Sequence, residues 1–281
     1  MSDVPSIQLN DGNQIPQLGF GVFQIEPDDT AEAVARALDV GYRHIDTAEM
    51  YGNEREVGEA VRASGLDRSD VYVTSKLNNS YHRPDDARRA FERTLQELGF
   101  DHVDLFLIHW PLPTLYEGDY VSTWRTLEDF KADGRARSIG VSNFQVDHLE
   151  RLAGETDVVP AVNQIELHPY LVNEEVRTYG ESHGIATEAW SPIAQGQVLD
   201  DPTVTEIADR LGRTPAQVVL RWHIERGSIV FPKSTTPERI RENFELFDFE
   251  LEPGDAERIE ELDRGEAGRT GPHPDRFAHA G

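Results

Sequence analysis

The sequence contains no cysteine and only three lysines, Lys76, Lys131 and Lys233, among its 281 residues. The lack of thiols excludes disulfides, thiolate metal sites and a cysteine nucleophile. No apolar run approaches the roughly 18 residues that a membrane-spanning helix requires. The first residues, MSDVPSIQLNDG, lack the basic and apolar regions of a signal peptide. We therefore expect a cytoplasmic protein that has no membrane partner.

Positive charge is also scarce, because 27 lysine and arginine residues face 52 acidic residues and leave a formal net charge of -25. An excess of that sign repels nucleic acid and anionic lipid, so neither is an expected partner. It also opposes self-association at low salt, and we expect a monomer. A strongly acidic, lysine-poor surface resembles that of proteins from salt-loving organisms, where high salt screens the repulsion between like charges.

Short apolar runs alternate with longer amphipathic stretches along the whole chain. Residues around Asn10-Asp11-Gly12 carry a turn signal that predicts an N-terminal hairpin within residues 1–17. Thr214 followed by Pro215 is typical of a helix start. The predicted strands are Leu18–Val22, His44–Asp46, Val71–Ser75, Val103–His109, Ser138–Ser142, Ala161–Glu166, Ile185–Trp190 and Ile229–Phe231. Since no linker interrupts this alternation, we expect one domain over residues 1–281, with a tail from 265 to 281.

Eight strand–helix units in about 250 residues match the size of a (β/α)8 barrel. The competing fold is an open doubly wound sheet, which usually carries a glycine-rich phosphate loop after its first strand. The stretch LGFGVFQ contains Gly19 and Gly21 but lacks the third glycine, and no helix begins there. We therefore predict an α/β fold, a (β/α)8 TIM barrel with an N-terminal β-hairpin.

Polar groups follow most of the predicted strands, and the carboxyl ends of barrel strands converge on one face. These residues are Asp46, Lys76, His109, Ser142, Asn143, Gln164, Glu166, Trp190, Ser191, Lys233 and Ser234. Taken singly, Asp46 could cap a helix and His109 could be a hydrogen-bonded core histidine. Lys76 is harder to explain in this way, because the chain otherwise avoids lysine. The convergence indicates a functional site.

The chemistry of four residues suits proton delivery to a carbonyl oxygen. A tyrosine with a pKa of about 10 is a poor proton donor at neutral pH. A buried lysine ammonium lowers that pKa by stabilising the phenolate, and a carboxylate keeps the buried lysine charged. Tyr51, Lys76 and Asp46 supply these groups, and His109 could orient the substrate oxygen.

Three separated motifs resemble the aldo-keto reductase family, namely GYRHIDTAEMYGNEREVG (41–58), SIGVSNF (138–144) and FPKSTTPERIRENFEL (231–246). The tail GRTGPHPDRF resembles the prokaryotic branch that includes 2,5-diketo-gluconate and methylglyoxal-type reductases. The resemblance implies reduction of an aldehyde or ketone by hydride transfer from NADPH, with NADH as the second candidate. It implies that Tyr51 is the general acid and that Lys76 lowers its pKa. Asp46 would then pair with Lys76, and His109 would orient the carbonyl group.

The resemblance also implies the cofactor contacts. Ser142, Asn143 and Gln164 would bond the nicotinamide carboxamide, and Trp190 would stack on its ring. The residues of the loop that would close over the pyrophosphate are Ser191, Gln195 and Gly196. Those that would hold the 2′-phosphate and adenine are Lys233, Ser234, Thr235, Arg239, Glu242 and Asn243. A dianionic phosphate is held by fixed cations, and a basic patch is informative in a chain of net charge -25.

Phe23, Asn78 and Trp110 are the candidates for the substrate pocket. The family often has a tryptophan where this chain has Asn78, so we expect a roomier and more polar pocket whose carbonyl substrate the sequence does not identify.

Three other functions remain as alternatives. A metal-dependent barrel hydrolase would need a ligand cluster, but none of the ten histidines forms a His-x-His or His-Glu-x-x-His motif, so no metal is expected. A Schiff-base aldolase could use Lys76 or Lys233 as its nucleophile, although it would not need the third motif. A regulatory relative that binds NADPH with little turnover is the non-enzymatic alternative.

Overall fold

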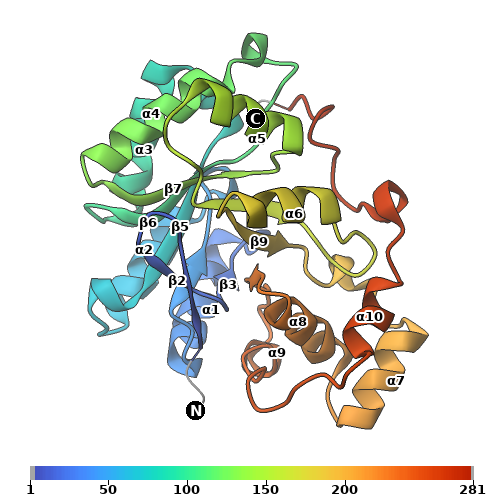
Figure 1. The fold of residues 1–281 in the computed structure, drawn as a ribbon. Helices are drawn as coiled ribbons and strands as arrows, with labels where there is room; N and C mark the ends of the chain where they lie inside the picture. Colours follow the sequence, from blue (N-terminus) through green and yellow to red (C-terminus); the bar gives the residue numbers. More distant parts are fainter. Residues whose placement is uncertain (1–3, 280–281) are drawn as a thin grey trace.

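The computed structural model describes residues 4–279, so the ends of the predicted hairpin segment and tail, residues 1–3 and 280–281, lie outside the described residues. One eight-stranded sheet runs in the order β10-β9-β8-β7-β6-β5-β4-β3, and every neighbouring pair is parallel. Its first and last strands meet through a parallel bridge between Leu18 and Val230, where Gly19 N donates to Val230 O at 2.7 Å. The predicted barrel is therefore confirmed (Figure 1).

The strands of the barrel lie close to the predicted ranges. They are β3 (Phe20–Gly21), β4 (His44–Asp46), β5 (Tyr72–Leu77), β6 (Val103–Ile108), β7 (Ala136–Ser142), β8 (Val162–Glu166), β9 (Ala186–Trp190) and β10 (Ile229–Val230). The main difference is β5, which extends two residues beyond the predicted end, so that Lys76 lies inside the strand. Strand ends are set by the hydrogen bonds of the neighbouring strands, which the sequence of one strand does not contain.

Helices follow every strand of the barrel and cover its outside (Figure 1). They are α1 (Pro27–Val40), α2 (Glu54–Ala63), α3 (Pro84–Leu98), α4 (Tyr120–Ala132), α5 (Val146–Glu155), α6 (Glu174–Ser182), α7 (Pro202–Leu211), α8 (Pro215–Glu225), α9 (Pro237–Glu242) and α10 (Asp255–Glu260). Thr214 caps α8 as predicted, because its hydroxyl accepts from Gln217 N while the Gln217 side chain accepts from Thr214 N. Such a cap stabilises a helix by about 1 kcal/mol.

The predicted hairpin is also present and closes the amino-terminal end of the barrel. β1 (Ser6–Gln8) pairs antiparallel with β2 (Gln14–Pro16), and Gly12 takes a φ of 90° in the turn. Leu9 and Ile15 are buried against residues of the barrel strands, including Leu105 and Leu107. Burial of each such side chain contributes about 1.5–3 kcal/mol. The lower half of the barrel is thus an apolar floor, and the polar residues gather at the opposite end.

The chain that follows α10 runs past α6 to α5 as an extended tail (Figure 1, red). It includes one short 3-10 helix, η6 (Gly265–Gly268). Between residues 4 and 279, no helix is long and apolar enough to cross a membrane.

Candidate active site

The buried ammonium group of Lys76 lies at the centre of the predicted catalytic residues. Its Nζ atom lies 2.7 Å from Asp46 Oδ1, 2.9 Å from the Thr47 carbonyl oxygen and 3.3 Å from the Tyr51 hydroxyl. The side chains of Lys76 and Asp46 are 0% and 2% exposed, so water does not screen this ion pair. Three of the four predicted catalytic residues therefore form one network.

Neighbouring strands bring these groups together. β4 pairs with β5, and Asp46 is the register partner of Thr74. Because alternate residues of a strand share a face, Lys76 projects on the same face as Thr74, one step nearer the carboxyl end. Beyond Asp46 the chain forms η1 (Glu49–Tyr51), which places the Tyr51 ring centroid 5.0 Å from Lys76 Nζ.

Asn53, which the sequence analysis did not single out, fixes the loop that carries Tyr51. Its fully buried amide donates to the carbonyl oxygens of Val22 at 3.1 Å and Ile25 at 3.2 Å. Its side-chain oxygen accepts from the Thr47 hydroxyl at 3.1 Å. The Gly-Asn pair at 52–53 signals a turn in the sequence, but it does not reveal these distant partners.

Burial and charge act in opposite directions on these groups. Burial lowers the pKa of Lys76, but the charge of Asp46 and the interactions with Tyr51 outweigh this effect, so the net shift is upward and the lysine stays an ammonium. Burial raises the pKa of Tyr51, and the Lys76 charge opposes this rise without cancelling it. The prediction of a lowered Tyr51 pKa is therefore right about the effect of Lys76 but wrong about the net shift, because it left out the burial of the phenol.

His109 follows β6, and its ring lies edge-to-face with Tyr51 at a centroid distance of 5.8 Å. Burial, assisted by the Lys76 charge, holds the pKa of His109 well below its usual value, so the ring is neutral. Its Nδ1 atom is buried and has no hydrogen-bond partner among residues 4–279. All four predicted catalytic residues thus lie at the mouth of the barrel.

The amide of Gln164 links two buried carboxyl groups below this mouth. Its Nε2 atom lies 2.8 Å from Asp46 Oδ2 and 2.7 Å from Glu188 Oε2. Glu188 is fully buried on β9, and the sequence analysis did not assign it a role. Burial and the Asp46 charge raise the pKa of Glu188 to about 8. Gln164 therefore connects the Lys76–Asp46 ion pair to Glu188, in addition to its predicted contact with the cofactor.

The residues predicted to contact nicotinamide form a hydrogen-bonded chain at the ends of β7, β8 and β9. Trp190 Nε1 donates to Asn143 Oδ1 at 2.8 Å. Asn143 Nδ2 donates to the His109 carbonyl oxygen at 2.9 Å and to Ser142 Oγ at 3.1 Å. Ser142 Oγ in turn donates to the Gln164 carbonyl oxygen at 2.8 Å. These residues therefore lie directly beside His109.

Left-handed backbone conformations concentrate at the same end of the barrel. In the described part of the chain, the non-glycine residues with positive φ are Gln24, Leu112, Tyr116, Glu117, Asn143, Asn173, Ser191, Ala194 and Gln195. All nine lie in segments that follow barrel strands. The loop predicted to close over a pyrophosphate contains three of them together with Gly196, whose φ is 90°.

The predicted phosphate-binding cations lie between β10 and the end of α9. Lys233, Thr235 and Arg239 are exposed. Neither Lys233 nor Arg239 forms an ion pair with another residue between 4 and 279, although acidic groups outnumber basic ones almost two to one. Two cations without ion-pair partners on one short segment suit a phosphate group, such as the 2′-phosphate that the sequence analysis predicted here.

Their polar neighbours are partly engaged within the protein. The buried Ser234 hydroxyl accepts from Thr236 N at 3.1 Å. Glu242 accepts from the Thr214 hydroxyl at 2.7 Å, which ties the end of α9 to the start of α8. Asn243 follows α9 and is half-buried.

Aromatic residues surround the mouth. The Phe23 side chain is 55% exposed, and its ring centroid lies 5.0 Å from that of Tyr51. Trp110 lies 6.5 Å from Trp190 and 4.3 Å from Phe277, measured between ring centroids. Phe277 belongs to the tail and was not predicted, because no periodic pattern links the tail to the loop after β6.

Asn78 has a local structural role. Its side-chain oxygen accepts from Ser80 N at 3.0 Å and caps η3 (Asn79–Tyr81). That oxygen is therefore engaged within its own loop.

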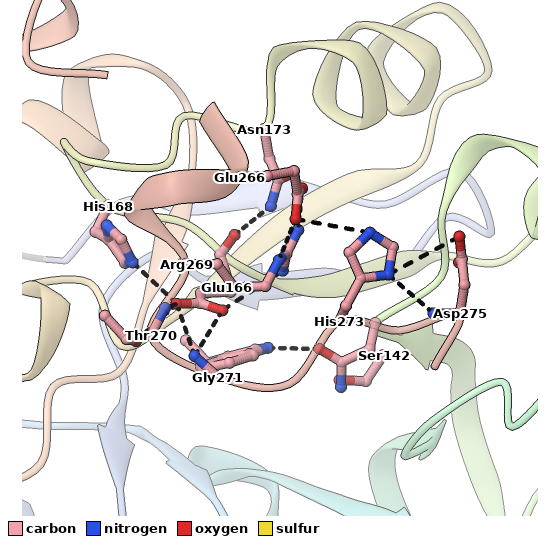
Figure 2. A network of polar contacts seen from close by, with 12 residues as sticks. Ser142, Glu166, His168, Asn173, Glu266, Arg269, Thr270, Gly271, His273 and Asp275 are labelled. Atoms are coloured by element: carbon pink, nitrogen blue, oxygen red, sulfur yellow. Dashed lines mark hydrogen bonds and ion pairs between the residues drawn. The ribbon is translucent and has the colours of Figure 1, made fainter. Parts of the chain in front are cut away.

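Glu166 anchors the tail across the barrel mouth (Figure 2). Its Oε1 atom accepts from Thr270 N and Thr270 Oγ1, both at 2.6 Å, and its Oε2 atom accepts from Gly271 N at 3.1 Å and Arg269 Nη1 at 3.5 Å. His168 Nε2 lies 3.0 Å from Oε1. Burial alone would raise the pKa of Glu166, but the hydrogen bonds from His168 and Thr270 leave it below its usual value. The carboxylate is thus charged at neutral pH.

A second contact ties the tail to α5. Ligand atoms of Asp147, His148 and Asp275 all lie within 4.8 Å of one another. His148 Nδ1 accepts from Gln145 N at 3.1 Å, so the proton of the neutral ring is on Nε2, 3.7 Å from Asp275. A protonated Nε2 has no lone pair for a metal, and the cluster serves as a tail contact.

Comparisons with known proteins agree with this fold. Residues 17–264 match the model of the aldo/keto reductase family. An aldo-keto reductase of Mycobacterium sp. (strain JLS) is 52% identical over 277 residues, which cover 99% of each chain, and the methylglyoxal reductase DkgA of Yersinia pestis is 49% identical over 280 residues, again 99% of each. Among solved structures, an aldo/keto reductase from Brucella melitensis is 51% identical with a TM-score of 0.89, covering 93% of this chain and 100% of its own. A mutant of the protein Gox0644, solved in complex with NADPH, is 44% identical with a TM-score of 0.94, covering 98% and 99%. The chain therefore belongs to the aldo/keto reductase family.

Proposed function

We propose that the protein reduces small aldehydes or ketones to alcohols with NADPH, and that Tyr51 is the general acid. The main support is the contact of Lys76 Nζ with both the Tyr51 hydroxyl, at 3.3 Å, and Asp46, at 2.7 Å. A carbonyl oxygen needs a proton once its carbon has accepted a hydride, and this phenol is the donor that the network supports.

The residues at the mouth fit NADPH, which supplies the hydride when bound. The unpaired Lys233 and Arg239 would hold its 2′-phosphate, because fixed cations suit a dianion. Asn143 and Gln164 would bond the carboxamide, and Trp190 would face the nicotinamide ring. The relative solved with NADPH, at 44% identity, supports the same cofactor.

Each catalytic side chain has a separate task. Tyr51 keeps its proton at neutral pH, since its pKa lies above the ordinary value. Lys76 stabilises the phenolate as the proton leaves, and Asp46 keeps Lys76 charged within the barrel. The neutral His109 orients the carbonyl oxygen. The same network argues against a Schiff-base aldolase, because a Lys76 with a raised pKa is an ammonium and not a nucleophile.

Relatives named methylglyoxal reductase make 2-oxoaldehydes the first substrates to test. We further propose that residues 1–281 act as one barrel domain and as a monomer, since a charge of -25 opposes self-association at low salt.

The test is Tyr51→Phe, which removes one oxygen from the network. Turnover of methylglyoxal, followed as NADPH oxidation, should fall by at least about 100-fold. NADPH binding, followed by quenching of tryptophan fluorescence, should persist. Tyr81→Phe is the matched control, because Tyr81 is a half-buried tyrosine outside the network. Retained turnover in Tyr51→Phe would reject the general acid, whereas NADPH binding by the wild type without reduction of any carbonyl would favour a regulatory relative.

A further inference from the structure

Glu188 is a fully buried carboxyl group to which the proposed reaction assigns no task. It lies in β9 two residues before Trp190, so both side chains project on the same face of the strand. Its Oε2 atom accepts a hydrogen bond from Gln164 Nε2 at 2.7 Å. The same amide nitrogen donates to Asp46 Oδ2 at 2.8 Å. The side chain of Gln164 therefore connects Glu188 to Asp46, which is the ion-pair partner of Lys76.

The charges around Glu188 do not balance if it is ionised. The network joined by Gln164 and Lys76 contains two carboxyl groups, Asp46 and Glu188, and one ammonium group, that of Lys76. The hydrogen bonds of Lys76 go to Asp46, the Thr47 carbonyl oxygen and Tyr51, and none goes to Glu188. A buried carboxylate without a cationic partner is strongly disfavoured.

His44 does not supply the missing positive charge. Its Nδ1 atom lies 3.3 Å from the Pro16 carbonyl oxygen, which only accepts, so Nδ1 carries the proton of the ring. Its Nε2 atom lies 3.1 Å from the Thr74 hydroxyl and 4.0 Å from Glu188 Oε1. Burial lowers the pKa of His44 to about 3, so the ring is neutral. Glu188 Oε1 itself has no hydrogen-bond partner among the described residues.

We propose that Glu188 is a positioning residue that carries a proton at neutral pH and, through the Gln164 amide, leaves Asp46 as the single carboxylate facing Lys76. This inference rests on the proposed function. The proton on Glu188 limits the negative charge beside Tyr51, where the reaction itself forms a phenolate. Loss of that proton adds a second negative charge to the network, disfavours the phenolate and slows reduction.

The expected transition lies where Glu188 titrates. Burial and the Asp46 charge place the pKa of Glu188 at about 8, so the loss of activity falls on the alkaline side of neutrality. Other titratable groups face the same network: Asp46, His44, Lys76, and Tyr72, whose pKa burial and the Glu188 charge raise well above its usual value. Burial raises the pKa of Asp46 too, but Asp46 has Lys76 at 2.7 Å, so we assign the proton to Glu188.

The test compares kcat of Glu188→Gln and wild type at saturating NADPH and methylglyoxal from about pH 6.5 to about pH 9. The variant keeps an acceptor for Gln164 but cannot ionise. The ratio of its kcat to that of wild type should rise about tenfold over this range, because only about a tenth of a group remains protonated one unit above its pKa. Tyr51 keeps its proton in both proteins over most of this range, because burial raises its pKa above the ordinary value. Glu181→Gln, which changes an exposed glutamate on α6, is the control and should give a constant ratio.

A constant ratio for Glu188→Gln, or an equal loss of activity in Glu188→Gln and Glu188→Ala at every pH, would overturn the proposal. A second readout does not require turnover. The infrared difference spectrum of wild type minus Glu188→Gln should contain the carbonyl band of a protonated carboxylic acid, which disappears as the pH rises past about 8. Its absence at neutral pH would also overturn the proposal. If the wild type reduced no carbonyl compound, the proposed function would fail and the infrared band would still decide the protonation of Glu188.

Discussion

The tail should loosen when Glu166 loses its charge, and Glu166→Gln is the smallest change that tests this. Both carboxylate oxygens accept hydrogen bonds from the tail: Thr270 N and Oγ1 donate to Oε1, Arg269 donates to Oε2, and Gly271 N is shared between the two. The amide of glutamine retains one acceptor and presents donors in place of the other. Two hydrogen bonds to a charged group, at about 1.5 kcal/mol each, amount to about 3 kcal/mol. The equilibrium for local opening of the tail should then rise by about 100-fold.

Hydrogen exchange of the amides of Thr270 and Gly271 measures this opening directly. Glu181→Gln, which changes an exposed glutamate on α6, is the control, and the amides of α8 report global stability. Unchanged protection of Thr270 and Gly271 in a folded Glu166→Gln protein would refute the reasoning. The pH dependence has a defined sign, because the pKa of Glu166 is lowered in the folded protein. Its contribution is present above the ordinary glutamate pKa and is lost as the pH falls through the lowered value.

Other perturbations test the remaining features. Arg239→Ala should weaken NADPH binding by about tenfold and leave NADH nearly unaffected, whereas the neighbouring exposed Arg241→Ala should change either by less than about threefold; equal losses for both cofactors would contradict the 2′-phosphate assignment. Phe277→Ala removes the ring that lies 4.3 Å from Trp110 and should raise KM for the carbonyl substrate about fivefold with little effect on NADPH affinity; an unchanged KM would exclude the tail from the pocket. Raising KCl from about 0.1 M to about 3 M should raise the melting temperature, because salt screens the repulsion in a chain of net charge -25; a fall would count against adaptation to salt.

The spatial grouping of the candidate catalytic residues could be predicted from the sequence because one geometric rule governs it. Parallel barrel strands end on one face, so a residue at the end of β4 and a residue near the end of β5 must lie close together. Asp46 and Lys76 obey this rule whatever the details of the packing. The direction of the Tyr51 pKa shift could not be predicted in the same way, since it depends on how deeply the loop buries the phenol.

Residues whose roles depend on contacts with distant segments were not accessible from the sequence. Glu188 sits in the segment IATEAW, where nothing marks it as the partner of Gln164. Asn53 and Phe277 likewise gain their roles from contacts with segments far away in the chain. For Asn78, the resemblance to the family suggested a position in the wall of the substrate pocket. The structure shows that its side chain also caps the turn of its own loop.

The left-handed conformations at the barrel mouth divide the molecule into two regions for protein engineering. Each non-glycine residue held in that conformation costs of order 1 kcal/mol, and the loop that contains Ser191, Ala194 and Gln195 bears this cost three times. At the opposite end, turns with positive φ use glycine, as at Gly99 and Gly134, and store no such strain. Libraries that seek a more thermostable enzyme should therefore target the floor and the outer helices. Libraries that seek new substrates should vary the mouth and accept a lower melting temperature as the consequence.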